Sequence, residues 1–359
     1  MRRRVAPKLL AWFRRHQRDL PWRRDRDPYR IWVSEVMLQQ TQAATVVRFF
    51  EPFLNRFPTV AALAEADEQD VLRLWEGMGY YRRARHLHQA ARELAARHQG
   101  RIPDDPAVLR TLPGVGRYIL GAVLSQAFDH PLPILEANSE RVLCRLLGQT
   151  EDPRRGPVRR WLWQAAEELL PARQVGDFNQ ALMELGALVC TPAAPRCDRC
   201  PLARECVARR RNLQDQLPAH APPPAVVEER EAAVVVRRGE QVFLVQRPGH
   251  GRWAGMWEFP HGSVAAAETH EEAAARLLVQ LTGLRADLGT EFLTVRHAVT
   301  HHRITLVCFE AQYRSGTFRS EFYVQGRWVG AHELHHFPVS APQRRLARAL
   351  VGDRQQQLF

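Results

Sequence analysis

Hydrophobic and polar positions follow two different periods along the chain, and the change of period divides it into two parts. Up to about residue 213, apolar residues recur every three or four positions, which predicts amphipathic helices. The basic first segment, 1–16, has the same spacing. Beyond it we expect helices over these ranges: 28–42, 45–57, 60–66, 71–78, 86–98, 118–124, 139–148, 157–169 and 178–189.

The last part of the chain alternates apolar and polar residues, a pattern that is typical of half-buried strands. We expect one helix over 269–281 and strands over these ranges: 232–236, 241–246, 291–297 and 303–313. The stretch 214–228 is rich in proline and predicts a semi-rigid linker. The expected domains are therefore 1–213 and 229–359.

Composition narrows the class of protein. A chain of 359 residues can form two domains with a core each. No apolar run approaches the roughly 20 residues that cross a bilayer, and Lys8 and Arg14 interrupt any signal-peptide core. The net charge of +12 favours a polyanionic partner. Lys8 is also the only lysine among 51 basic residues.

The stretch 112–116, LPGVG, leads into a helical pattern and is a candidate phosphate site. Gly114 and Gly116 allow positive φ and a close approach of the backbone to a ligand. N–H groups at the start of the following helix would face a phosphate. About twenty residues further along, Glu136 stands beside Asn138 at the next helix start. The alternative is a turn that only connects two helices.

Glu35 is the first candidate catalytic residue. It shares a helix face with Ile31 and Leu38, and no Lys or Arg lies three or four residues away to pair with it. A carboxyl group on an apolar face has a raised pKa, as a general acid requires. Alternatively, Glu35 reaches solvent or a distant arginine.

The segment 77–83, GMGYYRR, interrupts the helical pattern with glycines, paired tyrosines and arginines. Tyrosines stack against bases and arginines contact phosphates, which suits a nucleic-acid contact. The alternative is a helix C-cap followed by partly buried tyrosines.

Four cysteines with the spacing C-x6-C-x2-C-x5-C predict a metal site. They are Cys190, Cys197, Cys200 and Cys206, and prolines punctuate the loops near them. Four thiolates this close together bind zinc or an iron–sulfur cluster. The six cysteines do not suggest a disulfide scaffold in a chain of this length. Cys144 and Cys308 have no place in the pattern and look like core residues.

Residues 1–213 resemble the helix-hairpin-helix DNA glycosylases that carry a 4Fe–4S cluster, the endonuclease III-like superfamily. The LPGVG hairpin, the cysteine spacing and the carboxylate after the hairpin match. The motifs SEVMLQQTQ, GMGYYRRARHLH and FNQALMELGALVCTP resemble the adenine DNA glycosylases within it. The resemblance implies a mainly α region, a six-helix barrel module plus an iron–sulfur module. It also implies removal of adenine mispaired with 8-oxoguanine or guanine.

The resemblance also assigns the catalytic residues. Glu35 matches the glutamate that protonates adenine. Glu136 matches an aspartate that stabilises the oxocarbenium ion, in a family Asp-Gly-Asn loop that here reads Glu-Ala-Asn and ends at Asn138. Tyr118 stands where bifunctional relatives carry a Schiff-base lysine, so we expect a monofunctional glycosylase without efficient AP lyase activity.

Other matches concern the DNA and the excised base. Gln40 and Tyr80 match residues that insert into the duplex, Met78 matches a neighbouring apolar contact, and Gly114 and Gly116 hold the strand. The wall of the adenine pocket is matched by Trp22, Arg23, Leu38 and Gln180.

The C-terminal part, with its Trp-Glu-Phe-Pro segment, resembles a Nudix domain, which implies an α+β fold. The Nudix spacing is kept by Gly262, Glu268, Arg276 and Gly283. The three metal-binding acids are replaced by Leu277, Gln280 and Leu281, so no pyrophosphatase activity is expected.

The family reads 8-oxoguanine with a Phe-Ser-His loop of this domain. Here Thr300 and His301 match its last two residues, while Val299 replaces the aromatic. The alternative for this histidine-rich turn is a solvated hairpin end.

The resemblance implies a 4Fe–4S cofactor, double-stranded DNA with 8-oxoguanine:adenine or guanine:adenine mispairs as partner, and no membrane. We further expect a monomer in the cytoplasm of a bacterium, associated with the nucleoid. Two competing hypotheses are a glycosylase/lyase for oxidised pyrimidines and a non-enzymatic iron–sulfur DNA sensor.

Overall fold

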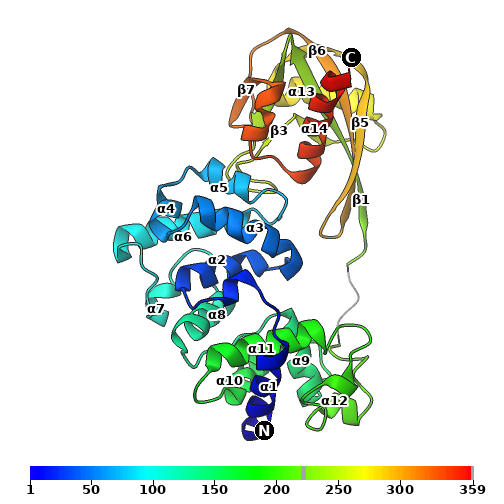
Figure 1. Ribbon diagram of the computed structural model, residues 1–359. Coiled ribbons are helices and arrows are strands. Elements are labelled where there is room, and N and C mark those ends of the chain that lie inside the picture. The colour runs from blue at the N-terminus through cyan, green and yellow to red at the C-terminus, as the bar shows by residue number, and fades with distance from the viewer. Residues whose placement is uncertain (220–223, 357–359) are drawn as a thin grey trace. The chain divides into compact units, whose positions relative to one another are not determined.

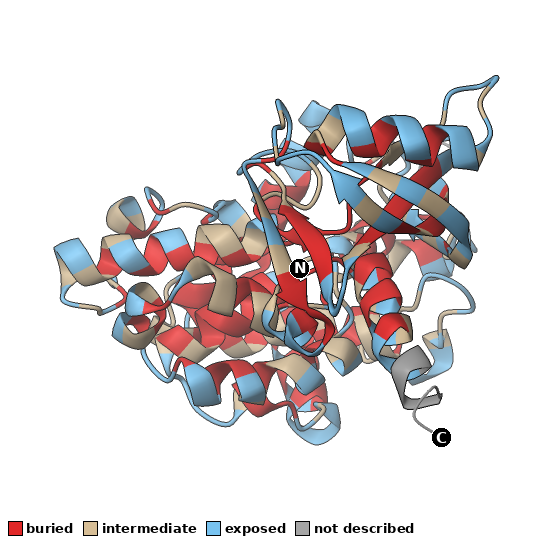
Figure 2. Cartoon of the chain, turned by 90° about the horizontal axis from the view of Figure 1, so that it is seen from above, coloured by how far each residue is buried: buried red, intermediate tan, exposed pale blue. Residues whose placement is uncertain are grey.

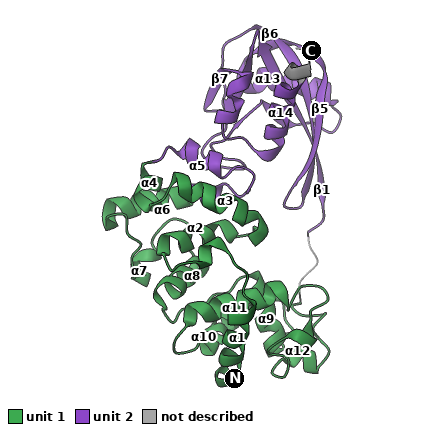
Figure 3. Ribbon diagram, viewed as in Figure 1, with its two compact units in different colours: residues 1–65, 86–222 green, residues 66–85, 223–359 purple. Residues whose placement is uncertain are grey.

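The computed structural model describes residues 1–219 and 224–356 and divides into two compact units (Figure 3). The first comprises Met1–Glu65 and His86–Pro222, and the second Ala66–Arg85 and Pro223–Phe359. Residues 220–223 of the expected linker and 357–359 of the expected second domain lie outside the described residues.

The first unit is helical (Figure 1). Its α-helices are α1 (Arg2–His16), α2 (Pro28–Leu38), α3 (Ala43–Arg56), α4 (Val60–Glu65), α6 (Arg82–His98), which begins in the second unit, α7 (Pro106–Leu109), α8 (Arg117–Phe128), α9 (Ala137–Leu147), α10 (Gly156–Leu169), α11 (Val175–Leu188) and α12 (Val207–Arg210). Two 3-10 turns, η1 (Pro21–Arg23) and η2 (Cys197–Arg199), complete it. No helix in the described part of the chain is long and apolar enough to span a membrane.

Most expected helices are present with shifted ends. The helix expected over 28–42 is wrong at its C-terminus, because α2 ends at Leu38. Gln40 has a φ of +57°, a left-handed conformation that a helix cannot continue through. α9 begins at Ala137, two residues earlier than expected, because the Glu136 side chain caps it.

Buried residues run through the middle of α2 and α8, and Figure 2 shows buried stretches inside the helical part. In α2 every residue from Ile31 to Met37 is buried, including Ser34 and Glu35. α2 packs against α8, and α11 packs against both α8 and α9. The helices that carry the candidate catalytic residues are therefore held by core packing.

The second unit contains a mixed sheet formed by β1 (Val227–Arg238), β2 (Gln241–Gln246), β3 (Trp257–Glu258), β4 (His261–Ser263), β5 (Arg285–Val299), β6 (His302–Ser315) and β7 (Gln325–Gly330). The main order is β3-β2-β1-β6-β5, while β4 pairs with β1 and β7 with β2. β1 and β6 are parallel, and the other pairs are antiparallel.

Two helices cover the two faces of this sheet. Ala232, Val234 and Val236 of β1 pack in a core with α13 (His270–Thr282). Ala233 and Val235 face the opposite side and pack with α14 (Ala341–Gln356), which follows the turn η3 (Ala331–His336). The alternation of side chains along β1 therefore fills two cores, which explains its continuous run of buried residues.

The four expected strands are present: β2 has the predicted bounds, while β1, β5 and β6 are longer than predicted. The mainly α and α+β fold classes are confirmed. β1 begins at Val227, inside the stretch expected as linker. β3 and β4 have two and three residues, too few to show an alternating pattern. The second unit also includes α5 (Glu68–Leu74) and the GMGYYRR segment, a grouping that linear order does not predict.

Candidate active site and cysteine cluster

Glu35 is buried in the middle of α2 and receives two hydrogen bonds from α8. The Tyr118 hydroxyl donates to Oε2 at 2.5 Å, and Nε2 of Gln126 donates to Oε1 at 2.7 Å. The two donors lie two helical turns apart on α8, so they hold both oxygens of one carboxyl group. Both of these partners donate to the carboxyl group, so a protonated Glu35 can direct its own proton elsewhere.

Burial dominates the protonation of this site. It raises the pKa of Glu35 above its usual value, although the bonds from Tyr118 and Gln126 oppose the shift, and the charge of Glu136 raises it further. Burial and the nearby carboxylates also raise the pKa of Tyr118 well above its usual value, so its hydroxyl keeps its proton. Glu35 thus lies in surroundings that suit a general acid.

Glu136 is the N-cap of α9. Its carboxylate accepts hydrogen bonds from the backbone N–H groups of Ser139 at 2.7 Å and Asn138 at 2.8 Å. The Ser139 hydroxyl accepts from the Glu136 N–H at 2.9 Å, which completes a capping box. Burial raises the pKa of Glu136, and the two backbone bonds oppose that shift. The extra methylene of glutamate is taken up by folding the side chain back over the helix end.

Asn138 links this cap to the loop that begins the cysteine cluster. Arg141 donates to Oδ1 of Asn138 at 2.8 Å and to the carbonyl of Cys190 at 2.8 Å. Because Oδ1 must be the acceptor for Arg141, the amide nitrogen faces Glu136, with Nδ2 to Oε2 at 3.2 Å. Gly186 of α11 permits this approach, since a Cβ there would lie 2.6 Å from Cβ of Asn138.

Arg23 is tied to a buried carboxylate that the sequence analysis did not identify. Glu184 of α11 is 0% exposed and accepts from Arg23 at 3.0 Å and from Arg18 at 2.7 Å. Burial alone would raise the pKa of Glu184, but the bonds from Arg18 and Arg23 outweigh it and lower the pKa to about 2. The positive charge of Arg23 in turn lowers the pKa of Glu35 slightly against burial.

The other residues assigned to the base pocket differ in exposure. Trp22 is buried and meets the Phe50 ring edge-on, with 5.4 Å between centroids. Leu38 and Gln180 are half-buried, at the end of α2 and within α11.

The hairpin before α8 has one left-handed glycine. Gly114 has a φ of +77°, and a Cβ there would lie 2.9 Å from Cβ of His86, so glycine is needed for both reasons. The positive φ considered for Gly116 is not found: its φ is −83°, and it is the N-cap of α8. A glycine N-cap supplies no side-chain acceptor, so first-turn N–H groups of α8 remain available to an anion.

The residues expected to contact DNA from other segments differ in exposure. Gln40 is exposed in the turn after α2. Tyr80 is 50% exposed with a φ of +49°, whereas Met78 is only 5% exposed. Thr300 and His301 form the tip of the β5–β6 hairpin, and Thr300 is exposed with a φ of +55°.

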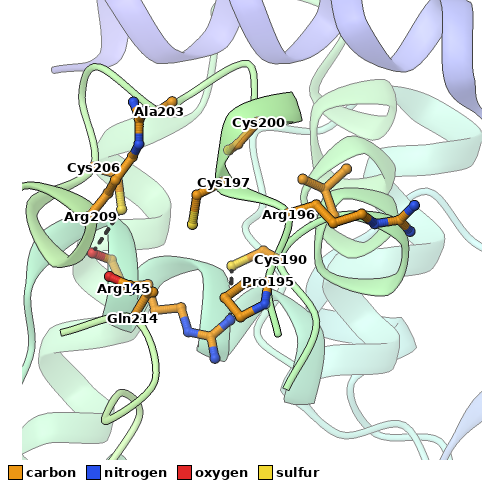
Figure 4. A pocket seen from close by; sticks show the side chains of 11 residues that line it. Arg145, Cys190, Pro195, Arg196, Cys197, Cys200, Ala203, Cys206, Arg209 and Gln214 are labelled. Atoms are coloured by element: carbon orange, nitrogen blue, oxygen red, sulfur yellow. Dashed lines mark hydrogen bonds between the residues drawn. The ribbon is translucent and has the colours of Figure 1, made fainter. Parts of the chain in front are cut away.

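The four cysteines of the predicted cluster line one pocket of about 310 Å³, including its solvent-open part (Figure 4). Arg145 donates to Sγ of Cys190 at 3.4 Å and to the carbonyl of Thr191 at 2.7 Å. Burial and the neighbouring thiols raise the pKa of Cys200 to about 12. A cationic metal group bound by these four thiols would favour their deprotonated form, and the donor set fits such a group.

The same four sulfurs are spread around the pocket. In the described part of the chain, no three His, Cys, Asp or Glu side chains lie close enough together to hold a metal ion. A single tetrahedral zinc would draw four sulfurs to about 2.3 Å from one point. Four thiols are the ligand set of zinc sites and of iron–sulfur clusters alike.

Residues that keep the Nudix spacing make contacts with one another in the structure. Arg276 of α13 pairs with Glu268 at 2.7 Å, which fixes the loop before that helix. Leu277 lies directly beneath Gly262, where a Cβ would be 2.8 Å from Cδ2 of Leu277. An apolar side chain thus stands at a position that carries a metal-binding acid in the Nudix pattern.

Two residues of the first unit were missed by the sequence analysis. Gln126 lies on the apolar helix α8, and Glu184 lies within the motif FNQALMELG, where Gln180 was selected instead. The one available signal for both was a polar residue within an otherwise apolar run of the sequence. A polar side chain buried in such a run requires a hydrogen-bond partner.

Sequence profiles of known families match both parts of the chain. A profile described as HhH-GPD superfamily base excision DNA repair protein matches residues 33–168. A profile described as NUDIX domain matches residues 232–349.

Whole-chain relatives are similar over most of the length. The chain is 36% identical to the adenine DNA glycosylase of Homo sapiens, covering 96% of this chain and 73% of the relative. It is 35% identical to the adenine DNA glycosylase of Rattus norvegicus, covering 95% of this chain and 76% of that relative.

Solved structures resemble the helical region. A thermostable thymine-DNA glycosylase aligns with a TM-score of 0.53 and 28% identity, over 58% of this chain and 97% of that one. A non-covalent endonuclease III–DNA complex aligns with a TM-score of 0.50 and 20% identity, over 60% of this chain and 99% of that one. This second match is a likeness of fold alone.

Proposed function

Since the chain belongs to the adenine DNA glycosylase family and is a DNA-binding base-excision repair enzyme that hydrolyses the N-glycosidic bond of adenine, we propose that Glu35 and Glu136 are its catalytic carboxyl groups. The observation that carries this proposal is the burial of Glu35 between two donors on α8. A neutral carboxyl group in that position protonates the adenine ring and makes the base a better leaving group.

Glu136 stabilises the positive charge that develops on the sugar as the bond breaks. Its backbone hydrogen bonds oppose the effect of burial and favour the ionised form. Asn138 holds the carboxylate in place, and Arg141 fixes the orientation of that amide. The negative charge of Glu136 in turn helps to keep Glu35 protonated, so the two groups divide the work of acid and electrostatic stabiliser.

The bound adenine lies against Trp22, Arg23, Leu38 and Gln180. Glu184 positions Arg23, because its two oxygens hold Arg23 and Arg18 together. The base leaves the stack to reach these residues.

The enzyme is monofunctional. AP lyase chemistry proceeds through an amine, and Tyr118 occupies the hairpin position of the lyase lysine. Lys8, the only lysine, forms an ion pair with Glu205, with 2.6 Å between Nζ of Lys8 and Oε1 of Glu205. Borohydride trapping of a covalent adduct as efficient as that of a glycosylase/lyase would contradict this proposal.

The preferred substrate is adenine opposite 8-oxoguanine or guanine. Thr300 and His301, at an exposed hairpin tip, contact the base opposite adenine, with the Thr300 hydroxyl as the polar group. Gln40, Met78 and Tyr80 belong to the contacts that hold the opened duplex.

Backbone groups of the hairpin complete the grip on the DNA. Gly114 and Gly116 hold a phosphate of the adenine strand near the uncapped N-terminus of α8.

The C-terminal unit has no pyrophosphatase activity. Leu277, Gln280 and Leu281 supply no acid to a metal, and Leu277 fills the space beneath Gly262. Incubation with deoxynucleoside triphosphates should therefore release no pyrophosphate.

The cysteine pocket holds a 4Fe–4S cluster on Cys190, Cys197, Cys200 and Cys206. When bound, the cluster supplies iron–thiolate bonds that tie the end of α11 to α12. Arg145 offsets thiolate charge through its bond to Cys190. The neighbouring arginines Arg196, Arg199, Arg204 and Arg209–Arg211 present positive charge to phosphates.

The domains proposed for these roles are 1–213 for glycosylase chemistry, 214–228 as linker and 229–359 for lesion recognition. The protein acts as a monomer in the bacterial cytoplasm, at the nucleoid.

The test compares duplexes that carry adenine opposite 8-oxoguanine, guanine or thymine. The expected product is an abasic site that is cut only after alkali, formed fastest opposite 8-oxoguanine and slowest opposite thymine. Lesion binding without base release would support the non-enzymatic hypothesis and overturn the proposal.

A further inference from the structure

The segment that carries Tyr80 belongs to the same compact unit as the C-terminal sheet. Residues 66–85, with α5, are grouped with residues 223–359, although the sequence places them within the helical region (Figure 3). The turn that carries Tyr80 and the hairpin tip of Thr300 and His301 are therefore parts of one unit.

An ion pair between Glu76 and Arg344 joins the two stretches of the chain in this unit. Nε and Nη2 of Arg344 donate to the two carboxylate oxygens of Glu76 at 2.6 and 2.7 Å. The remaining donors of Arg344 reach the carbonyls of Leu334 at 2.8 Å and Phe337 at 2.7 Å. The side chains are only 15% and 17% exposed. A bidentate ion pair with low exposure, whose other arginine donors are also bound, holds the two side chains in one relative orientation.

Three further hydrogen bonds, made by Gln69 and Arg85, join the segment to β3 and to the loop between β2 and β3. The Gln69 side chain accepts from Nε1 of Trp257 at 3.1 Å and donates to the carbonyl of Gly255 at 3.3 Å. Arg85 donates to the carbonyl of Gly249 at 2.7 Å. The segment is therefore attached at its start, middle and end.

Glu76 directly precedes the turn that presents Tyr80. The carbonyl of Gly79 accepts from Nε1 of Trp75 at 3.1 Å and from Arg83 at 3.2 Å. The Arg83 guanidinium lies over the Tyr80 ring, 5.3 Å from its centroid. These contacts tie the turn to Trp75 and Arg83, so holding Glu76 in place also sets the direction of Tyr80.

The β2–β3 loop also contacts β1, beside the tip of the β5–β6 hairpin. Arg252 approaches Glu229 of β1 at 3.4 Å, and His302, next to His301, approaches the same carboxylate at 2.7 Å. Contacts thus run within one unit from the Thr300–His301 tip through Glu229 and this loop to the segment that carries Tyr80.

We propose that Glu76 and Arg344 are positioning residues for lesion specificity, which fix Tyr80 to the unit that carries Thr300 and His301. The two contacts with the base opposite adenine are then set at a constant spacing and act together. This inference rests on the proposed recognition of 8-oxoguanine. It assigns Glu76 and Arg344 no part in breaking the glycosidic bond.

The test uses Glu76→Gln and Arg344→Met, which change the net charge in opposite directions. Single-turnover adenine release is measured over a range of enzyme concentrations, opposite 8-oxoguanine and opposite guanine. Both variants should lose about tenfold of the preference for 8-oxoguanine, with the rate at saturating enzyme nearly unchanged. Arg237→Met, which breaks the separate Arg237–Glu310 pair of the sheet, is the matched control and should keep the preference.

Coupling to Tyr80 is tested by a double-mutant cycle. Arg344→Met added to Tyr80→Ala should reduce the preference no further than Tyr80→Ala alone. If Arg344→Met does not fold, Gln69→Leu tests the same attachment with the same expected loss.

Two different failures can be told apart. Wild-type preference in Glu76→Gln and Arg344→Met, together with its loss in Tyr80→Ala, would overturn the inference and leave the proposed function intact. Absence of any preference in the wild type would overturn the proposed lesion recognition itself.

Discussion

The Tyr118 hydroxyl donates to Oε2 of Glu35 at 2.5 Å, so that the hairpin helix α8 and the helix α2 meet at the candidate general acid. The bond also draws the pKa of Glu35 downward against the effect of burial. We therefore propose that Tyr118, at the position matched to a lyase lysine, positions and tunes the candidate acid.

Tyr118→Phe should raise the pKa of Glu35, because it removes a hydrogen bond that stabilises the carboxylate. The alkaline side of the pH–rate profile for adenine release should move to higher pH, while the maximal rate falls by up to about 100-fold as the acid loses its fixed position. Tyr29→Phe is the matched control, since Tyr29 also lies on α2 but its hydroxyl donates to the carbonyl of Phe57. A lower rate with an unchanged profile would contradict the tuning role.

Glu136→Asp should retain both the fold and adenine release. Aspartate is a preferred N-cap, and it is the residue that the family carries at this position. Glu136→Ala should lose about 0.5–2 kcal/mol of stability with the cap and about 100-fold or more in rate with the carboxylate. The control is Thr269→Ala, which removes another capping-box residue and should lose stability without loss of the single-turnover rate. Equal rates in Glu136→Ala and wild type would remove Glu136 from the chemistry.

Glu184→Gln should make folding less sensitive to acid. The pKa of Glu184 is lowered to about 2 when folded, so its ion pairs stabilise the fold above its usual pKa near 4.5, and that contribution is lost as pH falls toward 2. The variant should be destabilised at neutral pH by less than the roughly 3–5 kcal/mol of a fully buried pair, because Arg18 is 38% exposed. Denaturant melts of both proteins at several pH values measure this. A stability difference that does not shrink between about pH 4.5 and 2 would contradict it.

Cys200→Ser should reduce the iron content of the purified protein and its thermal stability, because the pocket loses one of four ligands. Cys144→Ser is the matched control, since Cys144 is a buried core residue outside the pocket. It should keep full iron content. Equal iron in both variants, or zinc in place of iron in the wild type, would contradict the assignment of a 4Fe–4S cluster.

Several features could be predicted from the sequence because they depend on local pattern. The spacing of apolar residues placed the core helices, and the cysteine spacing identified side chains that line one pocket. The contacts of Gln126 and Glu184 could not be predicted, because they depend on which helices meet across the core. The grouping of Glu76 with Arg344 joins residues 268 positions apart, and no local period reports such a contact. Gln40 shows the remaining difficulty, since a helical pattern continued through a residue that the structure places in a left-handed turn.

The central claim is that Glu35 supplies the proton that releases adenine. It is tested most directly by single-turnover base release from a duplex with adenine opposite 8-oxoguanine, comparing the wild type with Glu35→Gln. The variant should stay folded and be at least as stable above about pH 4.5, since burial disfavours ionised Glu35 in the native state. We predict abasic sites with the wild type and no detectable adenine release with the variant. Wild-type rates in a folded Glu35→Gln protein would contradict the account.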